Sequence, residues 1–242
     1  ECVRTNIHGA ENIVNAAIRT GVERVIALST DKAANPINLY GATKLASDKI
    51  FIAGNNLSPT GGTKFSVVRY GNVLGSRGSV LPFFNKLAEA GETTLPITDE
   101  RMTRFWITLE DAVDFVIQSF ETMKGGEIFV PKLPSMNIID LASAIAPECD
   151  KKIIGIRPGE KIHEVMFTRD DASNTIEFKS YFVILPSSPQ WSVNKFRLTS
   201  SQKPGKLCSE NFEYNSGQNK SFLSVTQLKT LIANLNLDDI IR

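Results

Sequence analysis

The sequence predicts an α/β protein built on a doubly wound parallel sheet, because one helix–strand pattern occurs twice in succession. Apolar residues recur at helical spacing over 6–20, and an apolar strand follows at 22–28. The same order returns with a helix over 38–53 and a strand over 64–70. The first strand is apolar enough to be buried in a parallel sheet. The α-β-α-β order indicates the second half of a Rossmann-like domain.

A smaller α/β region is expected after residue 75, where a glycine-rich loop over 75–79 leads out of the sheet. We expect residues 1–75 to end the dinucleotide-binding domain and 76–170 to bind substrate, with some elements returning to the first domain. Residues 171–242 would form a C-terminal extension. Helices are predicted over 80–89, 109–123, 137–146, 160–167 and 224–235, strands over 94–98, 127–130, 152–156 and 177–185, and a loop over 186–220.

The composition argues against several classes of protein. The chain has 242 residues, of which 42% are hydrophobic, and a formal net charge of +1. No long block of like charge indicates nucleic acid or an anionic membrane as a partner, and no apolar run approaches the roughly 20 residues that span a bilayer. The three cysteines are too scattered for a disulfide framework, and neither histidine belongs to a ligand cluster. We therefore expect no bound metal and a reducing, cytoplasmic location.

A glycine-rich turn between a strand and a helix, which would hold the pyrophosphate of a dinucleotide, does not occur in the sequence. The glycine loop at 75–79 comes too late and leads away from the sheet. The chain also starts at Glu1 rather than at a methionine. We therefore expect a truncated chain that lacks roughly the first hundred residues of such a fold. By itself, this polypeptide is expected to bind a dinucleotide cofactor poorly.

Five reactive side chains lie close together in the sequence after the first strand. Thr30, Asp31 and Lys32 follow the strand directly, at the edge where open α/β sheets bind ligands. Tyr40 and Lys44 are spaced i, i+4 and therefore share one face of the next helix. A Tyr–Lys pair alone usually marks only an exposed helix face. Beside an ammonium, however, a phenol ionises more readily, so here the pattern indicates a redox site with a second acid/base pair at Asp31 and Lys32.

With these motifs, the chain resembles the inverting UDP-N-acetylglucosamine 4,6-dehydratases of the CapD-like polysaccharide biosynthesis group. This group belongs to the extended short-chain dehydrogenase/reductase superfamily. With Tyr40, the chain resembles the short soluble type within this group, because large membrane-anchored relatives tend to have Met at this position. The matching segments are residues 25–51, 65–84, 97–113, 125–136 and 153–166.

The resemblance implies a mechanism for these residues. Tyr40 would take the proton of the sugar 4-hydroxyl while hydride leaves C4, and Lys44 would bind the nicotinamide ribose and lower the Tyr40 pKa. Thr30 would hydrogen-bond near the 4-oxygen. Lys32 would remove the C5 proton and Asp31 would protonate the departing 6-hydroxyl, although these two roles remain interchangeable. The product would be UDP-2-acetamido-2,6-dideoxy-β-L-arabino-hex-4-ulose, for a surface glycan or a sugar of the pseudaminic acid type.

The resemblance also implies the binding groups. The cofactor would be NADP, with NAD as the alternative, the substrate a UDP-sugar, and the protein a homo-oligomer. Arg104 and Arg157 are expected to bind the UDP diphosphate, since a fork of donors suits phosphate oxygens. The expected cofactor-binding residues are Ser29, Tyr40, Lys44, Tyr70, Gly71, Asn72 and Val73, and the expected substrate-binding residues are Lys32, Asn72, Arg104, Arg157 and Glu160.

Two other interpretations of the sequence stay open. A UDP-sugar 4-epimerase of the same superfamily would need Tyr40 and Lys44 but would have no use for an acid/base pair at Asp31 and Lys32. Alternatively, the chain as given is a non-catalytic fragment, because it lacks the glycine-rich turn that holds the pyrophosphate.

Overall fold

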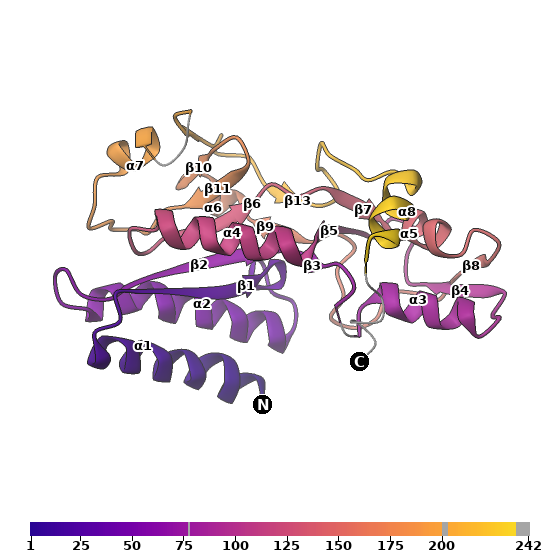
Figure 1. Cartoon of the computed structure of the whole chain (residues 1–242), viewed down its shortest axis with the longest axis horizontal. Coiled ribbons are helices and arrows are strands. Elements are labelled where there is room, and N and C mark those ends of the chain that lie inside the picture. Colours follow the sequence, from indigo (N-terminus) through magenta and orange to yellow (C-terminus); the bar gives the residue numbers. More distant parts are fainter. Residues whose placement is uncertain (77, 200–202, 236–242) are drawn as a thin grey trace. The chain divides into compact units, whose positions relative to one another are not determined.

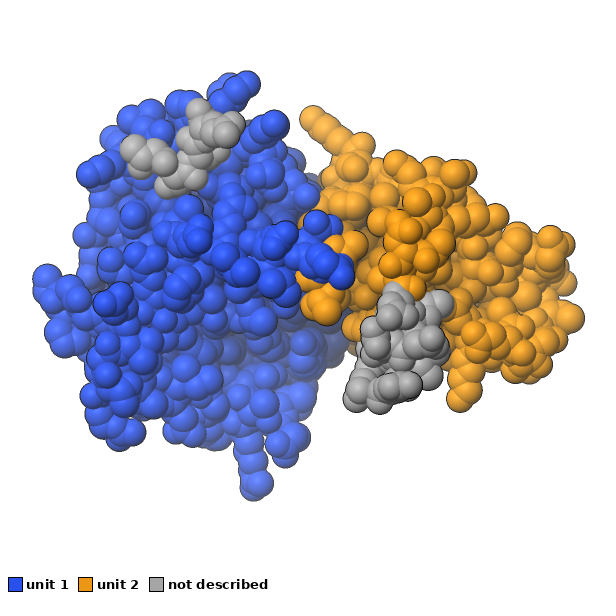
Figure 2. All heavy atoms as spheres, in the orientation of Figure 1, with its two compact units in different colours: residues 1–70, 110–132, 165–214 blue, residues 71–109, 133–164, 215–242 orange. Residues whose placement is uncertain are grey.

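A computed structural model describes residues 1–76, 78–199 and 203–235 and divides the chain into two compact units (Figure 2). Unit 1 holds residues 1–70, 110–132 and 165–214. Unit 2 holds residues 71–109 and 133–164 together with the chain from residue 215 onward. Each unit is therefore built from three separate stretches of the chain.

Unit 1 is built on a six-stranded sheet whose order is β1-β2-β6-β11-β10-β12. The first three strands run parallel, with Arg24 opposite Lys64 and Thr30 opposite Tyr70 in the β1–β2 pair. The chain reaches β6 only after passing through unit 2, which is why the unit is discontinuous. The strands are β1 (Arg24–Thr30), β2 (Lys64–Tyr70), β6 (Ile128–Pro131), β10 (Thr175–Glu177), β11 (Tyr181–Ile184) and β12 (Lys206–Leu207).

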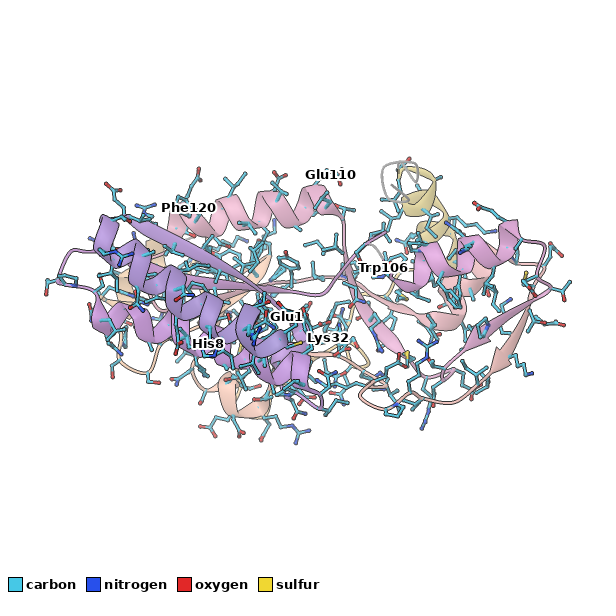
Figure 3. The ribbon with its side chains drawn as sticks, turned by 90° about the horizontal axis from the view of Figure 1, so that it is seen from below. Glu1, His8, Lys32, Trp106, Glu110 and Phe120 are labelled. Carbon is cyan, nitrogen blue, oxygen red and sulfur yellow. The ribbon has the colours of Figure 1, made fainter. Side chains whose placement is uncertain are left out.

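Helices cover both faces of this sheet (Figure 1). Helices α1 and α2 lie together on one face and α4 on the other, and Glu110 and Phe120 in Figure 3 mark the two ends of α4. Helix α2 begins where the Asn38 side chain accepts the Gly41 N–H, an N-cap at 2.8 Å. The helical elements of the unit are η1 (Val3–His8), α1 (Gly9–Thr20), η2 (Asp31–Ala33), α2 (Leu39–Leu57), α4 (Leu109–Thr122), α6 (Arg169–Ala172) and α7 (Val193–Thr199).

Among its described residues, unit 2 contains two small sheets and three helices. Strand β5 pairs with β3 in parallel and with β7 antiparallel, and β4 pairs with β8 in parallel. The strands are β3 (Asn72–Val73), β4 (Thr94–Ile97), β5 (Thr103–Ile107), β7 (Ser135–Asn137) and β8 (Asp150–Ile153), and the helices α3 (Val80–Glu89), α5 (Ile138–Ile145) and α8 (Val225–Ala233). A further pair is β9 (Val165–Phe167) with β13 (Tyr214–Asn215). The chain re-enters unit 1 at β9 and leaves it at β13.

Each unit has its own apolar core. In unit 1, Val68 and Phe129 of the sheet pack with Phe115 and Met123, beside Tyr181 of β11 and Phe196 of α7. In unit 2, side chains from all three helices enclose β4 and β5, with Leu95, Leu141 and Leu228 completely buried. Burial of this kind contributes about 25 cal/mol per Å² of apolar surface and is the main stabilising term of each unit.

The prediction of an α/β fold with a parallel sheet is confirmed. Most predicted helices and strands are present within a few residues, but the predicted helix over 160–167 is wrong, since residues 165–167 form strand β9. Backbone bonds to distant residues replace helical ones there: Ile162 O accepts from Thr103 N, and Glu164 N donates to Ser216 Oγ. The predicted strand over 177–185 is a hairpin of β10 and β11, the predicted loop over 186–220 contains α7, β12 and β13, and β5 was not predicted.

Asn55, near the end of α2, satisfies the backbone of the completely buried Phe65. Its amide oxygen accepts the Phe65 N–H at 3.0 Å and its Nδ2 donates to the Phe65 carbonyl at 2.8 Å. Asn55→Ala should therefore lower the free energy of unfolding by about 1–3 kcal/mol, since a buried N–H loses its partner. Urea unfolding measures this change. The matched control is Asn56→Ala at the exposed next position, which should change stability by less than about 0.5 kcal/mol; equal effects of both would contradict the prediction.

Candidate active site

Strand β1 ends in a cluster of three consecutive polar side chains within unit 1. The Thr30 hydroxyl donates to Asp31 Oδ1 at 2.9 Å, and Lys32 Nζ donates to the same oxygen at 3.0 Å. The Thr30 oxygen in turn caps the short helix η2 by accepting the Lys32 N–H at 3.4 Å. Lys32 is labelled in Figure 3. The cluster is therefore fixed by its own hydrogen bonds at the carboxyl end of a parallel strand, where such sheets bind ligands.

The Asp31 carboxylate is completely buried, whereas the Lys32 side chain is 34% exposed. Asp31 Oδ2 accepts no hydrogen bond from the described residues and is shielded from solvent. A buried carboxylate oxygen without a donor is costly, and such groups are typical of functional sites. The pair thus offers one buried carboxyl group and one ammonium that reaches the surface.

Helix α2 begins directly against this cluster because residue 41 is glycine. A Cβ atom at Gly41 would overlap the Lys32 carbonyl oxygen and lie 3.0 Å from Pro36 Cβ. Only a residue without a side chain allows this approach, which brings the first turn of α2, and with it Tyr40, onto the backbone of η2. The sequence analysis did not identify Gly41, although a glycine in the first turn beside a candidate base is a visible signal.

Tyr40 is 44% exposed and interacts electrostatically with the Asp31–Lys32 pair. Burial raises the pKa of Tyr40 above its ordinary value, the positive charge of Lys32 acts to lower it, and Asp31 and Cys2 raise it further. Tyr70, at the end of β2, also has a raised pKa because of burial and then the charge of Tyr40. The sequence analysis expected Lys44 to lower the Tyr40 pKa. The cation among the causes of the Tyr40 shift is Lys32, and burial outweighs its effect, while the role of Lys44 stays a prediction.

Lys44 is attached to strand β1 instead. Its Nζ donates to the Leu28 carbonyl at 2.7 Å. Burial lowers the pKa of Lys44, while the charge of Asp48 acts to raise it. Ser29, an expected cofactor ligand, is also committed within the protein, because it is buried and its hydroxyl donates to Asp48 at 2.9 Å. This placement does not support a contact between Ser29 and a cofactor.

The remaining expected site residues belong to unit 2. Asn72 and Val73 form β3 and pair with Trp106 and Ile107 of β5. Gly71, just before them, lies so close to β5 that a Cβ atom there would be 2.6 Å from Phe105 Cβ. The absence of a side chain at position 71 therefore has a packing explanation.

The two arginines expected at the diphosphate differ in their surroundings. Arg104 donates to the carbonyls of Thr103, Ile162 and Lys161 at 2.7, 3.1 and 3.0 Å, and its Nε lies 3.7 Å from Glu164. Most of its donors are thus occupied by the protein, which favours a structural role.

The Arg157 side chain, in contrast, is 62% exposed and lies 3.9 Å from Glu160, which has a buried carboxylate oxygen without a partner in the described chain. His163 hydrogen-bonds Thr103 at 2.8 Å, and burial followed by the charges of Arg104 and Arg101 lowers its pKa. Because Arg157 is exposed while Arg104 is bound to backbone carbonyls, Arg157 is the better placed of the two expected phosphate ligands.

Other features of the described residues do not add to this site. A cavity of about 470 Å³ lies at the other end of α2, near Lys49, Lys64 and Lys124, and is therefore remote from Tyr40 along the helix. No group of three or more histidine, cysteine or acidic side chains within the described ranges could hold a metal ion. Among the helices of the described chain, none is both long and apolar enough to cross a membrane.

The chain belongs to the polysaccharide biosynthesis protein family, whose model matches residues 1–186. It is 54% identical to the inverting UDP-N-acetylglucosamine 4,6-dehydratase of Campylobacter jejuni (serotype O:2, strain ATCC 700819 / NCTC 11168) over 96% of this chain and 70% of that protein. It is also 36% identical to the UDP-glucose 4-epimerase of Rickettsia massiliae, over 98% of this chain and 69% of that protein.

Solved structures show the same fold. Pen from Bacillus thuringiensis matches 97% of this chain and 70% of its own with a TM-score of 0.83 and 33% identity. DesIV, a dTDP-glucose 4,6-dehydratase of Streptomyces venezuelae solved with NAD and TYD, matches 66% of this chain and 56% of its own with a TM-score of 0.59 and 21% identity. At that identity, the second match supports the fold alone.

Replacing the Lys32 charge should change the ionisation of Tyr40. Lys32→Met removes the cation that lowers the Tyr40 pKa, so this pKa should rise further, while Lys32→Arg keeps the charge and should leave it nearly unchanged. Ultraviolet difference titration against the same variants carrying Tyr40→Phe isolates the Tyr40 signal. Burial raises the pKa of Tyr181 to about 12, so this group titrates later. An unchanged Tyr40 titration in Lys32→Met would contradict the assignment.

Proposed function

We propose that this chain carries the catalytic residues of an inverting UDP-N-acetylglucosamine 4,6-dehydratase. The observation that carries the proposal is the buried Asp31 carboxylate, hydrogen-bonded to Lys32 and electrostatically coupled to Tyr40 at the end of a parallel strand. Such a cluster supplies one base for oxidation and one acid/base pair for elimination. The 54% identity to a relative of that name supports the same choice.

The residues of unit 1 fit the nicotinamide end of a dinucleotide. Tyr40 is partly exposed beside Tyr70 at the carboxyl ends of β1 and β2, and Lys44 lies one turn along α2. Tyr40 and Lys44 would hold the nicotinamide ribose. The nicotinamide, when bound, accepts hydride from C4 of the sugar and later returns it to C6. The sequence has no strand followed by a glycine-rich turn that would hold the pyrophosphate.

Tyr40 takes the proton of the 4-hydroxyl in the first step of the proposed mechanism. The charge of Lys32 makes this easier, because it acts to lower the Tyr40 pKa. Thr30 would orient the 4-oxygen. Because the single proton of the 4-hydroxyl goes to Tyr40, Thr30 would act as the donor to the 4-oxygen, which requires its hydroxyl to turn away from Asp31 Oδ1. Oxidation at C4 yields a ketone, which acidifies the neighbouring C5–H.

Asp31 and Lys32 carry out the elimination. Transfer of one proton from Lys32 to Asp31 along their 3.0 Å hydrogen bond gives a neutral amine and a carboxylic acid without changing the net charge of the pair. Lys32 then takes the C5 proton, the C6–O bond breaks, and Asp31 protonates the leaving oxygen, which departs as water. The pair returns to the ion pair seen in the structure. Hydride addition at C6 and protonation of C5 from the opposite face complete the inverted product.

Further parts of the proposal concern binding and context. Arg157 and Glu160 would bind the diphosphate and the uridine ribose, and Asn72 the sugar or phosphate. Arg104 has fewer donors left for this purpose. NADP rather than NAD, a cytoplasmic homo-oligomer, and a product used for surface glycans or a sugar of the pseudaminic acid type complete the proposal. These points are supported by the family resemblance.

A UDP-sugar 4-epimerase is the second candidate, because relatives of that name match 98% of the chain at 36% identity. Epimerisation needs oxidation and reduction at C4 only, so a buried acid beside an amine would have no chemical use there. The higher identity to the dehydratase and the presence of this pair favour dehydration.

Product analysis in deuterated water distinguishes the two candidates. With the enzyme produced from its complete gene, UDP-N-acetylglucosamine should give a 4-keto-6-deoxy sugar with deuterium at C5, followed by proton NMR. Solvent deuterium enters C5 because the original proton is removed by Lys32 and replaced from the other face. A product that keeps its 6-hydroxyl and differs only at C4 would overturn the dehydratase and support the epimerase.

Asp31→Asn tests which residue is the acid. The amide cannot donate the proton that the leaving oxygen needs, so water loss should slow by about 10²- to 10⁴-fold. Lys32 can no longer pass its proton to residue 31, but its 34% exposed side chain can lose it to solvent, so deuterium should still enter C5 of the recovered substrate, which NMR detects. If Asp31 were the base instead, this exchange would disappear together with water loss. Normal dehydration by Asp31→Asn would contradict any acid/base role for Asp31.

A further inference from the structure

A buried polar network outside the cluster is centred on Asp48, one helical turn beyond Lys44. The Asp48 carboxylate is 1% exposed. Its Oδ2 accepts the Ser29 hydroxyl at 2.9 Å and Arg69 Nη2 at 3.0 Å. Arg69 is itself buried and donates through Nη1 to the Met166 carbonyl at 2.8 Å. One carboxylate thus connects helix α2 with strands β1 and β2, and through Arg69 with β9.

Lys44 and Asp48 are attached to neighbouring residues of the same strand. Lys44 Nζ donates to the Leu28 carbonyl, and Asp48 accepts from the side chain of Ser29. Tyr40, Lys44 and Asp48 follow each other at intervals of four residues, so they share one face of α2. Two attachments one turn apart fix how far α2 extends along β1. They therefore also fix the distance from Tyr40 and Lys44 to the end of the strand.

Lys44 and Tyr40 are influenced by different charged groups. Burial lowers the pKa of Lys44, and Asp48 on the same helix acts to raise it. The group that faces Lys44 from β1 is the neutral Leu28 carbonyl, while the Asp31–Lys32 pair acts on Tyr40. Arg69 faces Asp48 from β2. If Asp48 lost its charge, the buried Arg69 guanidinium would lose the carboxylate that it binds.

We infer that Asp48 is a positioning residue for the Tyr40–Lys44 pair: its carboxylate, bound by Ser29 of β1 and Arg69 of β2, anchors α2 and places Lys44 where the nicotinamide ribose would bind. The inference rests on the proposed function, because it concerns the role assigned to Lys44 there. It adds a residue that contacts neither substrate nor cofactor and acts through Lys44.

A second buried carboxylate in the same unit provides a matched control. Glu127 is completely buried and accepts the Ser66 hydroxyl and the Lys124 and Gly125 N–H groups at 2.6, 2.6 and 2.8 Å. It lies directly before β6, which runs parallel to β2. Glu127 is therefore at the amino end of these strands, whereas Tyr70 is at the carboxyl end. Glu127→Gln should lower stability without affecting Lys44.

The test is the pH dependence of cofactor reduction by the enzyme produced from its complete gene. In Asp48→Asn, the alkaline limb, where Lys44 loses its proton, should move to lower pH by about one unit, because the charge that holds this proton is gone. Glu127→Gln should lower the melting temperature and leave this limb in place. Should Asp48→Asn fail to fold, the double variant Asp48→Asn/Arg69→Gln removes the uncompensated guanidinium as well and should shift the limb in the same direction.

The outcomes separate the inference from the proposed function. A folded Asp48 variant, single or double, that keeps the wild-type alkaline limb overturns the inference, since Asp48 then acts only on stability, as Glu127 does. If the wild-type enzyme forms no 4-keto-6-deoxy product, the proposed function fails. If that product forms and the limb of the variant does not move, only the role of Asp48 fails.

Discussion

The candidate site depends on one close contact between two pieces of backbone. Helix α2 can begin against η2 only because residue 41 has no side chain to overlap the Lys32 carbonyl. The Asn38 cap fixes the residue at which the helix starts, and the contact at Gly41 fixes how near it lies to the strand end. Tyr40, the residue before this glycine, is consequently held beside Asp31 and Lys32. The chemistry proposed for these three side chains therefore follows from the packing of main chain on main chain.

This geometry changes which charge controls Tyr40. A lysine four residues along the helix is the obvious partner in the sequence, but in the structure its ammonium is bound to the Leu28 carbonyl. Lys32, from the neighbouring short helix, is the cation that opposes the effect of burial on Tyr40. The charge of Asp48, which Ser29 of β1 and Arg69 of β2 bind, acts to raise the Lys44 pKa. The two lysines thus have different electrostatic partners, and only one of them pairs with an acid at the strand end.

Local signals decided what the sequence could predict. The periodicity of residues 6–70 and the polar residues after the first strand were sufficient for the parallel sheet and for the grouping of Asp31, Lys32 and Tyr40. The predictions failed where distant partners determine the backbone, as in the segment before β9, whose amides and carbonyls bond to Thr103 and Ser216. Arg69 gave no signal for the same reason: it lies in an apolar strand, and its partner Asp48 is 21 residues away.

The coupling between Tyr40 and the acid/base pair also gives the proposed mechanism a direction. In the ion pair, Lys32 acts to lower the Tyr40 pKa more than Asp31 acts to raise it, although burial keeps this pKa above its ordinary value. Moving one proton from Lys32 to Asp31 neutralises both groups and removes both effects. The Tyr40 pKa must then rise, because the larger effect was the lowering one. Tyr40 would hold its newly acquired proton most firmly when the pair is neutral and ready for elimination. The same hydrogen bond that prepares the pair for water loss therefore opposes return of the proton to the 4-oxygen, which would reverse the oxidation.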